Sequence, residues 1–219
     1  MNAKIIARIC LLIGLAMYGA TSLVRPQAKD TRMLDRIVPD FQITDAPASL
    51  VLQRIAATSG IPIGMEAVPE IDGEMRPIDI ALKGATVKTL LDHVIKKDSR
   101  YVWQTAGSVI NVFPNGARDP LLATIVSHFE VKNVNKDGAI RALENSIEVK
   151  RILAITSLQD RTLKSLPGDS EYGLPKFSLD VRNSSVRSIL NSIMLKSGSN
   201  SWVFFRYGAG KDSFSLLMR

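Results

Sequence analysis

The chain has 219 residues, of which 46% are hydrophobic, and carries a formal net charge of +7. This length allows one or two small domains, and the hydrophobic fraction is ordinary for a folded protein, which argues against a disordered chain. The basic residues are scattered among acidic ones and form no aromatic-rich basic strand, so we expect no nucleic-acid partner.

The N-terminus has the pattern of a secretory signal. Lys4 and Arg8 precede an apolar run over residues 9–20, which small residues follow. A run this short is typical of a signal peptide rather than of a membrane span. We therefore expect residues 1–22 to direct the chain to the periplasm. Tyr18 would stand at position −3 for cleavage after Ala20, so a retained anchor in the inner membrane stays open, and it would be the only membrane contact.

The one cysteine, Cys10, lies inside this segment. It lacks the small-residue context of a lipoprotein cleavage site. Cleavage of the signal would leave a mature chain without cysteine, which would exclude both thiol catalysis and disulfide bonds. Stability is then expected to come from packing alone.

The first half predicts a small α+β unit over residues 40–114, preceded by a polar linker at 23–39. Alternating apolar residues indicate half-buried strands, and apolar residues at i, i+3 and i+4 indicate helices. In chain order we expect a strand at Phe41 to Ile43, a helix that opens at Asp45 or Pro47 and ends at Gly60, a strand at 61–65, a turn-rich crossover at 69–77, a strand at 78–83, a helix at 86–97, and a hairpin of Tyr101 to Trp103 with Val109 to Phe113.

The second half predicts the same order over residues 125–219, after a linker at 115–124. The expected elements are a strand at His128 to Val134, a helix capped by Asn135 and running to about Ser146, a strand at Arg151 to Ser157, a crossover at 158–175, a helix at 185–196, and strands at 201–206 and 214–218.

An internal repeat underlies this similarity. The segment from Ile78 to Trp103 matches the segment from Phe177 to Trp202 after a shift of 99 positions. Both copies place a short alternating strand before a helix with one apolar stripe. Gly84 or Asn183 would make the turn between strand and helix. The sequence therefore predicts an α+β protein of two small tandem domains, each with two helices packed on short mixed sheets.

The first half resembles the short N-terminal domain (STN domain) shared by bacterial secretins and TonB-dependent receptors. The resemblance covers residues 41–114 and rests on the segments FQITDAPASLVLQRIAATSGIPIGM and IDIALKGATVKTLLDHVIKKDSRYVWQTAGSVINVFP. The positions that match the family pattern are Leu82, Gly84, Val87, Leu90, Leu91, Tyr101, Val109, Ile110 and Val112. The resemblance implies a periplasmic α+β domain that binds other proteins. The second half matches more loosely, and the chain lacks the pore or barrel that normally follows this domain.

The residue types for catalysis or metal binding do not gather in the sequence. His93 and His128 have no second ligand at metal-binding spacing. The segment Gly208-Ala209-Gly210-Lys211 lacks the leading glycine of a phosphate loop, and a strand rather than a helix is expected after it. The acids Asp45, Glu66, Glu70, Asp72 and Glu74 lie around one crossover, where we expect a solvated surface rather than a catalytic pair. We expect no catalytic, cofactor or metal site.

Trp103 and Trp202 occupy matched positions in the two copies. Such residues either cover the core beside the helical stripe or anchor a partner, because exposed aromatic residues often dominate interface energy. The sequence thus favours a non-catalytic, exported interaction protein. Its partner would be an envelope protein such as a secretin, a TonB-dependent receptor or a regulator of one. The alternative is a small exported hydrolase or ligand-binding protein.

Overall fold

The computed structural model describes residues 31–68, 76–160, 174–207 and 213–219. The expected signal segment with Cys10, the acids Glu70, Asp72 and Glu74, and the glycine turn at 208–211 lie outside the described residues.

The first half follows the order that the sequence predicts, whereas the second half contains two further helices. The first half begins with a 3-10 turn at Thr31–Met33 and continues with β1 (Ile37–Ala46), α2 (Ala48–Ser59), β2 (Ile63–Glu66), β3 (Ile78–Thr86), α3 (Val87–Lys97), β4 (Tyr101–Ala106) and β5 (Val109–Pro114). The second half comprises α4 (Pro120–Ala123), β6 (Ile125–Val134), α5 (Lys136–Glu144), α6 (Ile147–Thr156), β7 (Gln159–Asp160), β8 (Phe177–Ser185), α7 (Val186–Ser197), β9 (Ser201–Tyr207) and β10 (Ser213–Met218).

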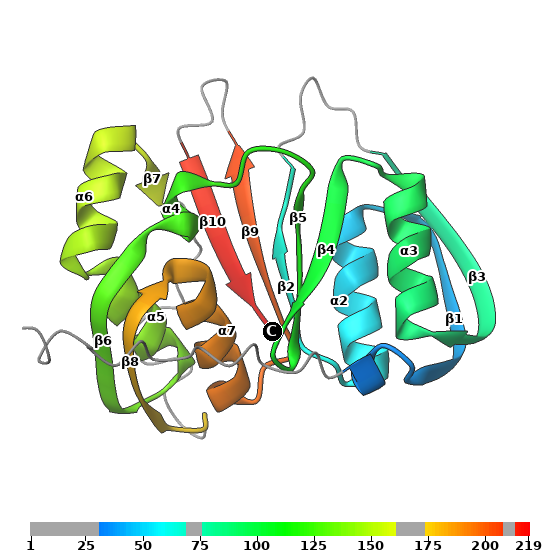
Figure 1. Ribbon diagram of the computed structural model, residues 1–219, viewed down its shortest axis with the longest axis horizontal. Coiled ribbons are helices and arrows are strands. Elements are labelled where there is room, and N and C mark those ends of the chain that lie inside the picture. The colour runs from blue at the N-terminus through cyan, green and yellow to red at the C-terminus, as the bar shows by residue number, and fades with distance from the viewer. Residues whose placement is uncertain (1–30, 69–75, 161–173, 208–212) are drawn as a thin grey trace, which may run out of the picture.

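A single six-stranded sheet runs through the middle of the molecule in the order β4-β5-β2-β9-β10-β7. Its centre is the parallel pair β2 and β9, one strand from each half. Helices α2 and α3 lie on one side of this sheet and α5 and α7 on the other, and the antiparallel pairs β1–β3 and β6–β8 form the outermost layers (Figure 1). The layers are therefore strand pair, helices, central sheet, helices, strand pair.

The alternation of side chains along β9 explains why one sheet serves two cores. Val203 packs in the hydrophobic cluster of the first half, whereas its neighbours Trp202 and Phe204 pack in that of the second. Successive residues of a strand point to opposite faces, so a strand covered by helices on both sides must be apolar along its length. Residues 201–204 are all buried, as this position requires.

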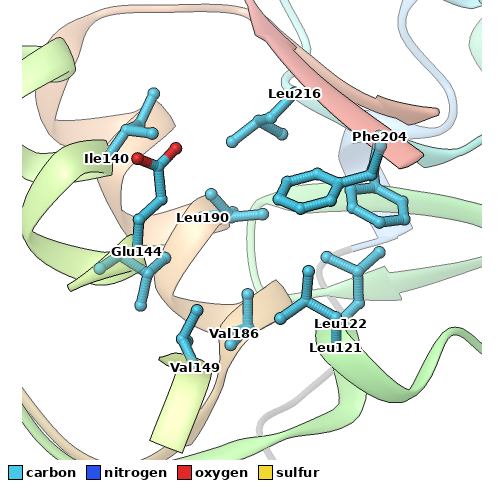
Figure 2. Close-up of a pocket in the computed structure, with 11 residues that line it drawn as sticks. Leu121, Leu122, Ile140, Glu144, Val149, Val186, Leu190, Phe204 and Leu216 are labelled. Atoms are coloured by element: carbon cyan, nitrogen blue, oxygen red, sulfur yellow. The ribbon is translucent and has the colours of Figure 1, made fainter. Parts of the chain in front are cut away.

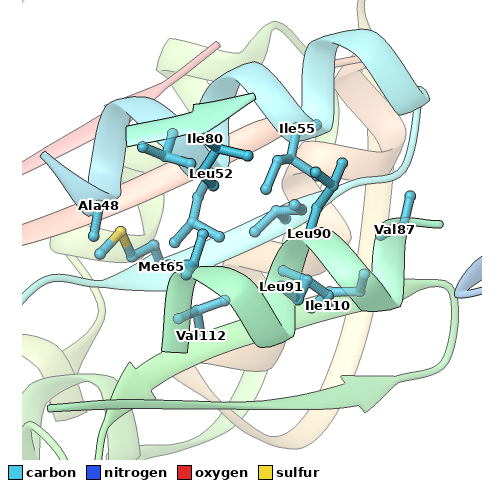
Figure 3. Close-up of a cluster of buried hydrophobic side chains, with 14 of the residues drawn as sticks. Ala48, Leu52, Ile55, Met65, Ile80, Val87, Leu90, Leu91, Ile110 and Val112 are labelled. Atoms are coloured by element: carbon cyan, nitrogen blue, oxygen red, sulfur yellow. The ribbon is translucent and has the colours of Figure 1, made fainter. Parts of the chain in front are cut away.

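The first cluster lies between α2, α3 and the strands on either side of them. Leu52 and Ile55 from α2 meet Leu90 and Leu91 from α3, and Met65 of β2 closes the cluster from the sheet (Figure 3). These side chains are buried at the i, i+3 and i+4 spacing that the sequence displays. The predicted stripe of each helix thus faces the core.

The repeat is reproduced in local geometry. Gly84 and Asn183 both adopt a left-handed backbone, with φ of 60° and 48°, but they lie inside β3 and β8, which continue to the start of each helix. The side chains of Thr86 and Ser185 cap α3 and α7 by accepting hydrogen bonds from the amides three residues later. The repeat therefore extends to the backbone conformation and the helix caps, whereas the expected turn between strand and helix is part of the strand.

Three boundaries differ from the expectation. The linker at 23–39 was too long, because Leu34 and Val38 are buried and β1 begins at Ile37. The prediction of a linker at 115–124 is wrong for residues 120–123, which form α4 and bury Leu121 and Leu122. Residues 151–157 belong to a helix and its cap rather than to a strand.

The α+β class is confirmed, whereas the division into two small tandem domains is not. The two halves share one sheet, and β2 is hydrogen-bonded to β5 on one side and to β9 on the other. Within the described residues, no helix has the length and apolarity needed to cross a membrane.

Candidate functional site

The two tryptophans make the same hydrogen bond in the two halves. Nε1 of Trp103 in β4 donates to Oδ1 of Asp92 on α3 at 3.2 Å. Nε1 of Trp202 in β9 donates to Oδ1 of Asn191 on α7 at 2.8 Å. Asp92 and Asn191 are themselves 99 residues apart, so both the indole and its acceptor repeat.

The burial of the two indoles differs. Trp202 is completely buried, because β2 lies beside β9 and Gly64 of β2 stands against the indole. A side chain in this position packs the interior and has no surface to offer a partner. Trp103 is only partly buried, in contact with the first cluster. Of the two residues predicted to bind a partner, Trp103 alone keeps accessible surface.

The edge of the central sheet lies directly beside Trp103. β4 pairs antiparallel with β5 along one side, and β4 is the last strand in the order of the described sheet on the other. Its residues Gln104 and Ala106 are exposed, and Val102 is partly so. A strand in this position presents backbone N–H and C=O groups that another extended segment can pair with.

A second candidate is a buried network of charges where the two halves meet. Glu66, the last residue of β2, forms an ion pair with Arg187, the second residue of α7. Both side chains are less than one-tenth exposed. Glu66 Oε1 also accepts a hydrogen bond from the amide of Asp119 at 2.6 Å. Burial raises the pKa of the Glu66 carboxyl, and this outweighs the lowering effects of the Asp119 amide and the Arg187 guanidinium.

Asp119 extends this network to the second half of the sheet. Its Oδ2 accepts from Nε of Arg206 in β9 at 2.5 Å, and its Oδ1 accepts from the amide of Leu121 at 2.8 Å and so caps α4. The Arg187 guanidinium also lies 5.6 Å from the ring centroid of Phe113. Each carboxylate thus has an arginine partner, which is the arrangement of an ion-pair network that fixes two elements to each other.

No motif in the sequence indicates Arg187, Asp119 or Arg206 as members of a site. Arg187 occupies the repeat position of Lys88, whose ammonium group makes an exposed ion pair with Asp92. Lys88 and Arg187 are both basic, but their surroundings differ. Strand β2 of the first half pairs with β9 of the second half and so brings Glu66 to Arg187.

The other sequence candidates stand apart from each other. Nε2 of His128 lies 3.0 Å from Oδ1 of Asp180 on the neighbouring strand β8, and both side chains are exposed. His93 is half-buried on α3, and its Nε2 is buried with no hydrogen-bond partner among the described residues. Asp45 is exposed in β1. Among the described residues, no group of three or more His, Cys, Asp or Glu is placed to hold a metal ion.

An apolar cavity of about 30 Å³ lies in the second half, between helices α4 to α7 and the sheet. Figure 2 shows Leu190, Val186, Leu122 and Phe204 directed into it, with Glu144 at its side. Apart from Glu144, its lining residues are apolar, so it offers almost no polar partner to a bound molecule. The cavity therefore does not favour the ligand-binding alternative.

A scan against protein-family models finds no match to the chain, and a search of the curated proteins finds no significant relative.

Proposed function

We propose that this protein is an exported periplasmic interaction module without catalytic activity, which docks an extended segment of an envelope protein on the edge of β4. The observation that carries the proposal is the open edge of the six-stranded sheet beside the partly exposed indole of Trp103. Backbone pairing would supply affinity, and side-chain contacts at alternate positions would supply specificity.

The identity of the partner class follows from the sequence alone. The secretory pattern at residues 1–22 supports a location in the cell envelope, and the resemblance of residues 41–114 to the STN domain supports a role in a secretion or receptor system of the outer membrane. The expected partner is therefore a component of such a system. The α+β class, with two helices between strand layers in each half, agrees with this proposal.

Photo-crosslinking in the native host tests this proposal. A photoreactive amino acid would replace Gln104, which is exposed on β4, and in a matched strain it would replace Lys132, which is exposed on β6. We expect position 104 to capture a secretin, a receptor or a regulator of one, identified by mass spectrometry, and position 132 to capture none. The same set of proteins at both positions would overturn the docking role of β4.

A further inference from the structure

The edge of β4, at which the described sheet ends, is the counterpart of an edge that is occupied inside the same molecule. β4 and β9 carry the repeated tryptophans, and each pairs antiparallel with the strand that follows it, β5 or β10. On the opposite side, β9 is paired with β2, whereas β4 ends the described sheet. The shared indole hydrogen bond, to Asp92 in one half and Asn191 in the other, indicates that the two indoles adopt the same orientation.

The pairing of β2 with β9 shows what this edge accepts. β2 runs parallel to β9, and Gly64 is the residue directly opposite Trp202. A Cβ atom at Gly64 would lie 2.4 Å from Cε2 of the indole, which is closer than atoms can approach. A glycine at this point lets the neighbouring strand lie flat against the tryptophan, and the indole then becomes fully buried.

In a strand docked on β4, the positions equivalent to Ile63 and Met65 would be less restricted than the position equivalent to Gly64. Ile63 and Met65 point to the other face of the sheet, where they join the cluster beneath α2. On β4 the corresponding face carries Val102 and Gln104, which are partly or fully exposed. The position opposite Trp103 is therefore the one at which a docked strand would be most restricted.

We propose that the edge of β4 binds an extended segment of another protein that runs parallel to β4 and places a glycine opposite Trp103. This inference rests on the proposed function and names the chemistry of the partner. A second copy of the chain cannot supply β2 itself, since both edges of β2 are already paired. We therefore propose a different polypeptide as the source of the segment.

Titration with two peptides, followed by NMR of the ¹⁵N-labelled chain, tests this inference. The probe is the sequence of residues 61–67, IPIGMEA, and the matched control has alanine in place of the glycine. We expect the first peptide to shift the indole N–H signal of Trp103 and the amide signals of Tyr101–Ala106, while the indole signal of Trp202 stays unchanged. The variant Trp103→Phe identifies which indole signal is which.

The control peptide should bind at least roughly tenfold more weakly, because the methyl group of its alanine would clash with the indole. In Trp103→Phe the smaller ring should reduce this difference. Equal binding of the two peptides, or shifts that lie away from β4, would overturn the inference. So would Trp103 signals that move with protein concentration alone, since these would identify a second copy as the occupant.

The outcome separates this inference from the proposed function. Capture of an envelope protein at position 104 without binding of either peptide would leave the docking role standing and refute the glycine-containing parallel strand. Discrimination between the peptides without any capture in cells would support the strand chemistry and refute the proposed envelope partner.

Discussion

Gly64 and Trp202 fill one space between the two halves of the protein. The indole lies over the backbone of β2, and a methyl group on Gly64 would need the place of its ring atoms. Ring atoms in a closely packed interior cannot move aside as the end of a flexible side chain can. At the scale of single residues, this contact is the tightest fit among the glycines of the described chain.

The substitution Gly64→Ala should lower the free energy of unfolding by about 1–3 kcal/mol, which is the usual penalty for overpacking a core. Urea unfolding followed by circular dichroism measures it. Gly84→Ala is the matched control, because Gly84 has open space around its Cα and only a left-handed φ of 60°, for which we expect a loss of about 1 kcal/mol.

A double-mutant cycle identifies the cause. Trp202→Phe removes the ring atoms nearest Gly64, so the combined variant should lose less than the sum of the two single changes. A strictly additive result would contradict the proposed steric contact.

The sequence could predict part of this contact. A glycine inside a strand pattern indicates close approach of another group, and that signal was present at Gly64. Its partner could not be predicted, because Trp202 is 138 positions further along the chain and shares its local pattern with Trp103. Only the pairing of β2 with β9 distinguishes the buried indole from the accessible one.

At the scale of elements, α6 is where the sequence interpretation was wrong. The apolar run at 151–157 predicts a strand, yet Val149, Ile152 and Leu153 follow the i, i+3, i+4 spacing of a helix and all three contact the second cluster. This helical spacing can be recognised only when the sequence is read from Val149, two residues before the apolar run begins. Val149 is the one residue of α6 that is buried, and Ile147 and Ile155 are more than 70% exposed.

The cavity beside α6 leaves room for one more methyl group. Val186→Ile, at the start of α7, should therefore raise the free energy of unfolding by up to about 0.8 kcal/mol, the value of one buried methylene. The repeat supplies the control, because Val87 holds the same position on α3 and is completely buried. Val87→Ile should be neutral or destabilising. Thermal unfolding of both variants measures the difference, and a larger gain at Val87 would contradict our interpretation of the cavity.

At the scale of the whole molecule, the ion pair of Glu66 and Arg187 joins the first half to the second. A buried carboxylate that loses its partner is strongly destabilised, since burial alone already raises its pKa. Arg187→Met should therefore lower stability by about 3–5 kcal/mol at pH 7. Lys88→Met, at the equivalent position in the first half, removes only an exposed pair and should cost less than about 1 kcal/mol.

The effect of Arg187→Met should depend on pH in a defined direction. A carboxyl whose pKa is higher in the folded state than in the unfolded state destabilises the fold once it is ionised, so stability falls as pH rises from about 4.5 to the raised value. The difference between the variant and the wild type should consequently shrink as pH is lowered toward 4.5. A difference that stays constant with pH, or that persists in Glu66→Gln/Arg187→Met, would argue against an unpaired Glu66 as its source.

The arrangement of the halves could not be predicted from local patterns. Helices and their caps depend on neighbours within a few residues, and these were largely correct, as the cap at Asn135 and the helix end at Gly60 illustrate. The junction depends on contacts between residues more than a hundred positions apart, such as Glu66 with Arg187. Because the two halves have similar sequences, the sequence predicts two similar domains. In the structure, the shared six-stranded sheet joins the halves into one unit.

The position of β9 has a consequence for how the chain is made. β2 lies at residues 63–66, but the strand that pairs with its second edge lies at 201–207, more than a hundred positions further along the chain. During synthesis β2 and the helices of the first half can therefore form while this edge of β2 is still uncovered. The edge is closed only after residues 201–207 have been made. During that interval the edge of β2 is open to any extended polypeptide, which makes this stage the one most exposed to aggregation and most in need of a chaperone.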